Sequence, residues 1–142
     1  KAAEPISEAI EHAWRMSGSD TIDLLMARVD SFVLSMDLDL ALQVLDAVTE
    51  LAPDDAEAWH QRGIVNFMKG DDQRALTDVR RSLDLDPKNY KAQKDLGMVL
   101  RGTGDKKGAL AAYRKALELN PFFDQARPAE QELSREVEGQ NI

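Results

Sequence analysis

Apolar side chains recur every three or four residues along most of this chain, and this spacing predicts amphipathic α-helices. Two such stretches, at 56–69 and 72–85, are separated by Gly70 and Asp71, and the same arrangement returns around Gly104. Glycine suits the end of a helix because it adopts positive φ without strain, and aspartate caps the helix that follows. The pattern therefore predicts an all-α protein of paired helices joined by tight turns.

The chain also repeats itself at a fixed interval. The segment RALTDVRRSLDLDP at 74–87 returns thirty-four residues later as GALAAYRKALELNP at 108–121, and Pro53 lies thirty-four residues before Pro87. A constant period of this size is typical of a solenoid, in which each unit buries its apolar face against its neighbours. The predicted organisation is an N-terminal helix at 1–21 that packs on the array, three units at 22–55, 56–89 and 90–123, and a C-terminal capping helix and tail at 124–142.

Small residues stand at matching positions of the units and indicate where two helices approach closely. Gly63 and Gly97 share one position of the repeat, and Ala75 has an alanine counterpart in both other units. Antiparallel helices pack this closely only where small side chains leave room for larger ones to interdigitate. The first unit departs from the pattern, since it has Val29 at the glycine position and Met36 at the turn.

These positions resemble the tetratricopeptide repeat family, whose units combine W-x2-L-G-x2-Y with later alanine, aromatic, alanine and proline residues. The resemblance implies an α-α superhelix, a solenoid of three helical hairpins. Arg28 and Arg62 stand where the family often has leucine, and we interpret both as structural, with head groups that reach a neighbouring carboxylate. The second unit meets the family pattern at Trp59, Gly63, Ala75 and Pro87, and the third meets it at Leu96, Gly97, Ala109, Tyr113, Ala116 and Pro121.

The resemblance also implies where a partner would bind. In tetratricopeptide arrays the first helices of the units line a concave groove, and four positions of each first helix face it. The matching residues run from an acidic end through an apolar middle to a basic end, which would suit a segment with an apolar anchor and complementary charges. They are Asp23, Met26, Asp30 and Val33 in the first unit, Glu57, His60, Ile64 and Phe67 in the second, and Lys91, Lys94, Met98 and Arg101 in the third.

The predicted function is therefore a non-enzymatic protein–protein interaction module, an adaptor or scaffold that holds a peptide segment or partner protein in the groove. The carboxylate clamp of chaperone-binding members of the family is not expected. Of the equivalent positions only Lys91 keeps the cation, and Asp30 and Asp95 would repel a carboxylate. The equivalent positions are Met26, Asp30, Gln61, Lys91 and Asp95.

Composition argues against several other classes of function. With no cysteine and only two histidines, His12 and His60, the sequence offers too few side chains for a zinc site or a Ser-His-Asp triad. We expect no catalytic residues, no metal and no cofactor. The formal net charge of −8 argues against nucleic acid as a partner. No apolar run approaches the roughly 20 residues needed to insert into and span a membrane.

The ends of the chain suggest an alternative function and a location. Ile6, Ile10 and Trp14 belong to an apolar stripe that either shields the first unit or packs against another protein. The alternative to groove binding is a structural homodimer or assembly factor that uses this N-terminal helix or the convex face. The chain begins at Lys1 rather than Met, and the segments at 17–26 and 135–140 resemble small exported proteins of Gram-negative bacteria. This favours the periplasm over the cytoplasm.

Overall fold

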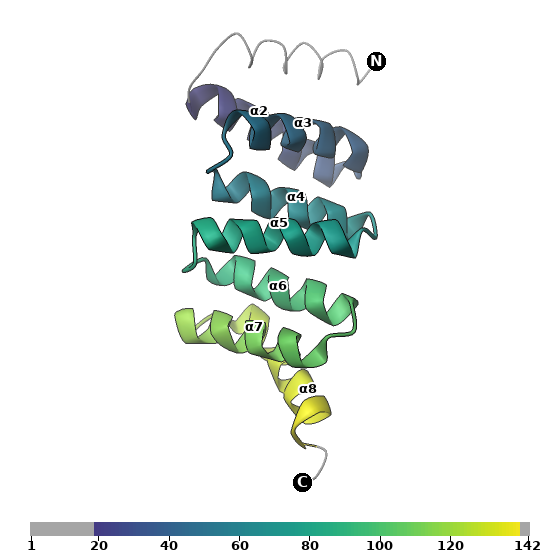
Figure 1. The fold of residues 1–142 in the computed structure, drawn as a ribbon, viewed down its shortest axis with the longest axis vertical. Coiled ribbons are helices and arrows are strands. Elements are labelled where there is room, and N and C mark those ends of the chain that lie inside the picture. Colours follow the sequence, from purple (N-terminus) through teal and green to yellow (C-terminus); the bar gives the residue numbers. More distant parts are fainter. Residues whose placement is uncertain (1–18, 140–142) are drawn as a thin grey trace.

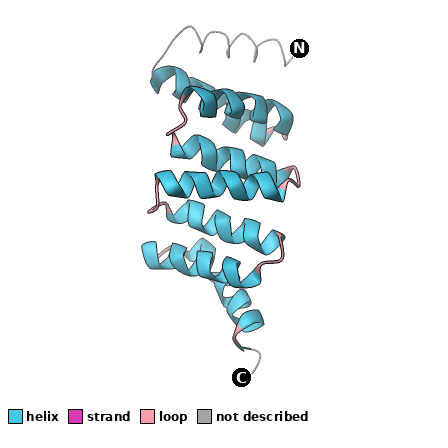
Figure 2. Ribbon diagram, in the orientation of Figure 1, coloured by secondary structure: helices cyan, strands magenta, loops and turns pink. Residues whose placement is uncertain are grey.

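The computed structural model describes residues 19–139, and every regular element in that range is a helix (Figures 1 and 2). The helices follow one another along the long axis of an elongated array (Figure 1). The elements are α2 (Ser19–Leu34), α3 (Leu38–Leu51), α4 (Ala56–Met68), α5 (Asp72–Leu85), α6 (Tyr90–Gly102), α7 (Lys106–Leu119), the 3-10 helix η1 (Asp124–Ala126) and α8 (Arg127–Val137).

Three helix pairs, α2–α3, α4–α5 and α6–α7, form hairpins, and the second helix of each pair also packs against the helix that follows it. The turns inside α4–α5 and α6–α7 lie at the right-hand edge of Figure 1, while the connections from α3 to α4 and from α5 to α6 lie at the left-hand edge. The all-α array of three hairpins with a C-terminal helix, predicted from the sequence, is confirmed.

The turns inside the hairpins share one hydrogen-bonding scheme. In the second unit the Gly70 amide donates to the Phe67 carbonyl and the Asp71 amide donates to the Asn66 carbonyl, and the other two units repeat both bonds. The scheme requires one residue in the left-handed region, where Gly70 has φ 85° and Gly104 has φ 91°. The Asp71 carboxylate then accepts a backbone N–H from the first turn of α5. The glycine-aspartate turns predicted from the sequence are therefore present.

Glycines allow the helices of the second and third hairpins to approach closely. A Cβ on Gly63 would lie 2.6 Å from Val79 Cγ2, and a Cβ on Gly97 would lie 2.8 Å from the Tyr113 ring. Ala75, on the facing helix of the second hairpin, is fully buried. The small residues therefore have the packing role that their spacing predicts.

The C-terminal helix closes one end of the described array. α8 packs on α7, its Leu133 is fully buried, and Arg114 of α7 lies 3.3 Å from Glu130 and 2.6 Å from Glu138. The apolar stripe predicted for the N-terminal helix, and with it the basis of the homodimer alternative, lies outside the described residues. Among the helices that are described, none combines the length and apolar character needed to cross a bilayer.

Candidate protein-binding surface

The first helices of the second and third hairpins bring several predicted binding residues together. α4 and α6 are in contact, and His60 Nε2 of α4 lies 2.6 Å from Asp95 Oδ2 of α6. The positive charge of Lys91, on α6, also acts on the Glu57 carboxyl of α4. We call the twelve residues predicted on α2, α4 and α6 the candidate face.

His60 is turned into the protein, with 7% of its surface exposed. In addition to its bond with Asp95, its Nδ1 lies 3.5 Å from Glu57 Oε1. Burial alone would lower the pKa of His60, but the hydrogen bond to Asp95 and the proximity of Glu57 outweigh burial and raise the pKa to about 9. His60 is therefore charged at neutral pH, and its side chain joins α4 to α6 instead of facing a partner.

One partner of His60 could have been found in the sequence and the other could not. Glu57 precedes His60 by three residues on one helix, which is the spacing of side chains that meet on a helix surface. Asp95 is thirty-five residues away, and only the stacking of two hairpins brings it to His60. The repulsion expected between Asp95 and an anionic ligand is correspondingly reduced, because Asp95 is paired with a cation.

The cations of α6 are mostly paired within the chain. Lys94 Nζ lies 3.1 Å from Asp95 Oδ1, and Arg101 Nη2 lies 2.9 Å and 3.5 Å from two carboxylates of α8, those of Glu132 and Glu136. Lys91, by contrast, is exposed at the start of the helix. The basic end of the candidate face is therefore weaker than its residue types suggest, because neighbouring carboxylates neutralise it.

The middle of the candidate face is apolar. Ile64 and Phe67 of α4 and Met98 of α6 are each half-buried, so part of every side chain remains in solvent. Phe67 reaches α6, where a Cβ added to Gly102 would lie 3.0 Å from Phe67 Cε1. These three side chains offer apolar surface that a partner could cover.

The contribution of α2 divides into two exposed acids and two core residues. Asp23 and Asp30 are exposed. Met26 and Val33 are only partly exposed and pack against the hydrophobic core formed with α3 and α4. The acidic character predicted for this end is therefore available to a partner, while the apolar residues mainly hold the first hairpin together.

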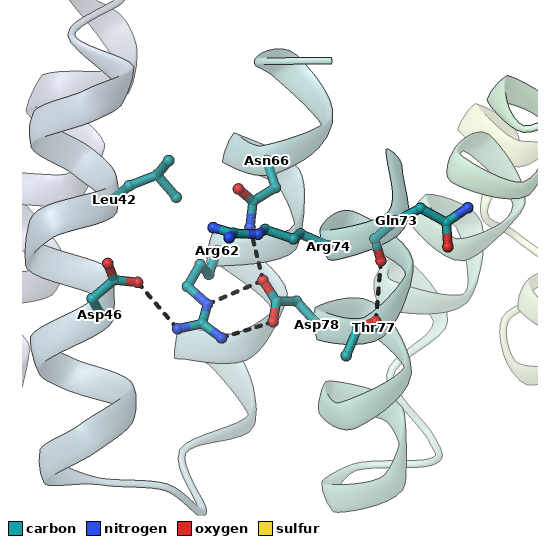
Figure 3. Close-up of a pocket in the computed structure, with 8 residues that line it drawn as sticks. All are labelled: Leu42, Asp46, Arg62, Asn66, Gln73, Arg74, Thr77 and Asp78. Atoms are coloured by element: carbon teal, nitrogen blue, oxygen red, sulfur yellow. Dashed lines mark hydrogen bonds and ion pairs between the residues drawn. The ribbon is translucent and has the colours of Figure 1, made fainter. Parts of the chain in front are cut away.

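A separate hollow of about 320 Å³ lies between α3, α4 and α5 (Figure 3). Arg62 lines it, and its Nε and Nη2 each donate to Asp78 at 3.0 Å while Nη1 donates to Asp46 at 3.1 Å. Asn66 Nδ2 donates to the same buried Asp78 carboxylate at 3.0 Å. The structural role predicted for Arg62 is confirmed, because its head group links three helices through carboxylates.

No Ser-His-Asp arrangement occurs within residues 19–139. The ring nitrogens of His60 face two carboxylates, and no hydroxyl group in this range hydrogen-bonds to them. In the same part of the chain, no group of three or more side chains is placed to hold a metal ion. The His60–Asp95 pair is accounted for by its link between α4 and α6.

The Tetratricopeptide repeat family model matches residues 56–89 and 90–123, which contain the second and third hairpins. A TPR repeat-containing protein of Rhizobium etli is 34% identical over 90 residues, which cover 63% of this chain and 44% of that protein. The chain thus spans less than half the length of this curated relative.

Solved structures share the fold. The Sgt2 TPR domain from Aspergillus fumigatus has a TM-score of 0.81 and 22% identity, covering 88% of this chain and 84% of that one. The first TPR of Spaghetti (RPAP3), bound to the HSP90 peptide SRMEEVD, has a TM-score of 0.77 and 18% identity, covering 80% of this chain and 90% of that one. At these identities the likeness concerns the fold alone. The stacked hairpins and the two family matches show that residues 56–123 form two tetratricopeptide repeats, a fold common among protein-interaction modules.

Proposed function

We propose that the candidate face binds an extended or helical segment of a partner protein, so that the chain serves as an adaptor or scaffold. The observation that carries this proposal is the half-buried apolar group of Ile64, Phe67 and Met98, with the exposed charges of Asp30 and Lys91 on the helices around it. Covering apolar surface supplies affinity at about 25 cal/mol per Å² before the costs of association. The flanking charges would select the orientation of the segment.

The expected ligand is an internal segment with an apolar anchor rather than a free carboxylate. The RPAP3 relative was solved with the HSP90 peptide SRMEEVD. In this chain, Lys91 is the only cation at the positions equivalent to a carboxylate clamp. Asp95 forms ion pairs with His60 and Lys94, so neither of these cations is left to bind a free carboxylate. With a short array we expect roughly micromolar affinity.

Site-specific photocrosslinking in the native cell tests this assignment. The photoreactive residue p-benzoylphenylalanine replaces Lys91 on the candidate face, and in a matched control it replaces Lys107, an exposed lysine at the start of α7. We expect a protein partner to be captured from position 91 and not from position 107. Capture from position 107 alone would contradict the assignment.

The captured segment is then synthesised and its affinity measured by calorimetry. Met98→Ala removes apolar contact area and Lys91→Glu reverses an exposed charge, so each should weaken binding by about fivefold or more. Lys107→Glu should leave the affinity unchanged. If both variants of the candidate face bind as the unmodified chain does, the partner is bound elsewhere.

A further inference from the structure

The turns of the first two hairpins carry exposed apolar side chains that do not belong to the candidate face. Leu34 is 87% exposed, Met36 63% and Met68 40%. Leu34 and Met68 are thirty-four residues apart and so occupy the same position in adjacent units. An ion pair between Lys69 and Asp39 ties the two turns together. We call Leu34, Met36 and Met68 the edge cluster.

Met36 occupies the edge cluster at a conformational cost. Its φ is 61°, and it is the one non-glycine residue with positive φ in the described part of the chain. Its amide donates to the Val33 carbonyl, the bond that Gly70 and Gly104 make in the other units. A side chain other than Gly, Asn or Asp is disfavoured in this region. The turn therefore retains strain to present a side chain that is mostly in solvent, and such strain is concentrated at functional positions.

Carboxylates outnumber cations around the edge cluster. Lys69 and Arg74 are each paired, with Asp39 and Asp71 respectively, whereas Asp37 is exposed and has no ion pair within residues 19–139. The surface formed by the two turns is therefore apolar with an acidic border. The carboxylates of the two turns are those of Asp37, Asp39, Asp71 and Asp72.

The third hairpin lacks this surface. Gly102 stands at the position of Leu34 and Met68, and Gly104 stands at the position of Met36. Asp105 keeps the position of Asp37, but Lys106 and Lys107 then stand where the first unit has Leu38 and Asp39. The exposed apolar side chains are thus confined to the first two turns, and in the third turn two lysines offset the one aspartate.

We propose that the edge cluster is a second docking site, which takes a cationic amphipathic segment of another protein. The apolar side of the segment would cover Leu34, Met36 and Met68, and a lysine or arginine on its border would pair with Asp37. A second copy of this chain is a poorer occupant, because each copy has a net charge of −8 and would bring carboxylates against carboxylates. This site is separate from the candidate face and does not depend on it.

The methionines of the chain provide a direct readout of the two surfaces. The full chain, labelled with ¹³C at the methionine methyl groups, is titrated with a synthetic helix of about 14 residues that has leucine on one side and lysine on the other. We expect the Met36 and Met68 signals to shift while those of Met26 and Met98, on the candidate face, stay in place. Shifts at Met26 and Met98 alone, or no shifts, would overturn the proposal.

Variants separate a binding role of Met36 from a structural one. Met36→Gly removes the side chain together with the backbone strain, so affinity for the lysine peptide should fall by about fivefold or more while Tm stays the same or rises. Met98→Ala should keep the affinity for this peptide. Unchanged binding by Met36→Gly would overturn the proposal.

Two further controls test the chemistry of the occupant. A peptide with glutamate in place of lysine should not bind, because it would face the acidic border; equal binding of both peptides would overturn the proposal. Without peptide, the Met36 signal should be independent of protein concentration. A concentration-dependent Met36 signal would instead assign the edge cluster to self-association and overturn the choice of a cationic partner.

Discussion

The first hairpin and the two that follow are versions of one repeat, yet they pack differently. The α4–α5 and α6–α7 interfaces are more extensive than the α2–α3 interface. At one repeat position the later hairpins have Gly63 and Gly97, where the first has Val29. The missing Cβ of Gly63 lets Val79 approach the helix backbone, whereas the fully buried Val29 side chain occupies that space itself. The residue at this position thus limits how closely the two helices of a hairpin can approach.

The junctions between hairpins differ as well. α4 is joined to α6 by the buried His60–Asp95 pair. The corresponding residues on α2 and α4 are Met26 and Gln61, which carry no charge, and the first hairpin shares an apolar cluster with α4. Removing one partner of a buried charge pair is costly because it leaves the other charge buried without compensation. The first helices of the second and third units are therefore joined by a buried charge pair. The first and second units are joined by apolar packing together with two more exposed ion pairs to α3, those of Arg62 and Lys69.

The largest effect on stability is expected when the second hairpin receives the valine that the first hairpin has at this position. Gly63→Val places a Cβ 2.6 Å from Val79 Cγ2 and 3.2 Å from two backbone atoms of α5. Because backbone cannot yield as a side chain can, we expect a loss of about 3 kcal/mol in the free energy of unfolding, measured with urea. For Gly97→Ala the three nearest atoms all belong to the Tyr113 side chain, so this substitution should cost about 1–2 kcal/mol. A Gly63→Val variant within about 1 kcal/mol of the unmodified chain would contradict this explanation of the packing difference.

The His60–Asp95 junction predicts a pH dependence that the first junction lacks. The folded pKa of His60, about 9, lies above its ordinary value of 6.5. Protonation therefore stabilises the fold fully below pH 6.5, and this contribution is lost as the pH rises through about 9. It amounts to about 2 kcal/mol, with about 3 as an upper limit. His60→Gln should remove this part of the pH dependence in urea unfolding between neutral pH and about pH 10.

The matched control is Met26→Leu, which changes the uncharged residue that α2 has at the repeat position of His60. It should leave the pH profile of the unmodified chain in place. If His60→Gln and the unmodified chain lose stability in parallel as the pH rises, the pair does not couple the two hairpins by charge.

A smaller effect is expected at the turns. Gly104→Ala introduces a Cβ with nothing within 4 Å, so its cost is conformational alone. We expect a loss of about 1 kcal/mol, seen as a lower urea midpoint. Met36→Gly, at the same repeat position, should raise the midpoint or leave it unchanged. A stabilised Gly104→Ala variant would show that positive φ is not costly in this turn.

The smallest expected difference concerns helix caps. The Asp105 carboxylate accepts the Gly108 amide at 2.9 Å, whereas Asp37, at the same repeat position, makes no side-chain capping bond. Asp105→Ala should therefore lower the free energy of unfolding by about 1 kcal/mol, and Asp37→Ala by only a few tenths. Thermal unfolding followed by circular dichroism measures both. Equal losses would mean that Asp37 caps α3 in solution.

Much of the fold could be predicted because its signals are local or periodic. The spacing of apolar residues predicted each described helix pair, and Gly70 and Gly104 predicted the turns, since few other residues accept their φ. Gly63 and Gly97 predicted close packing because the same small residue returns at the same place. Less of the candidate face could be predicted in this way. Its residue types were predicted, but the burial of His60 and the pairing of Arg101 with α8 depend on contacts between units.

The sequence by itself determined the helices, their period, and the residue types that each unit offers to a partner. These follow from interactions within a few residues or from repetition, so they can be deduced without knowing how the units stack. Only the tertiary structure decided which charges remain available and which apolar side chains stay in solvent. Asp95 meets His60, and Leu34, Met36 and Met68 remain uncovered, because stacking sets the distances between residues that lie far apart in the chain.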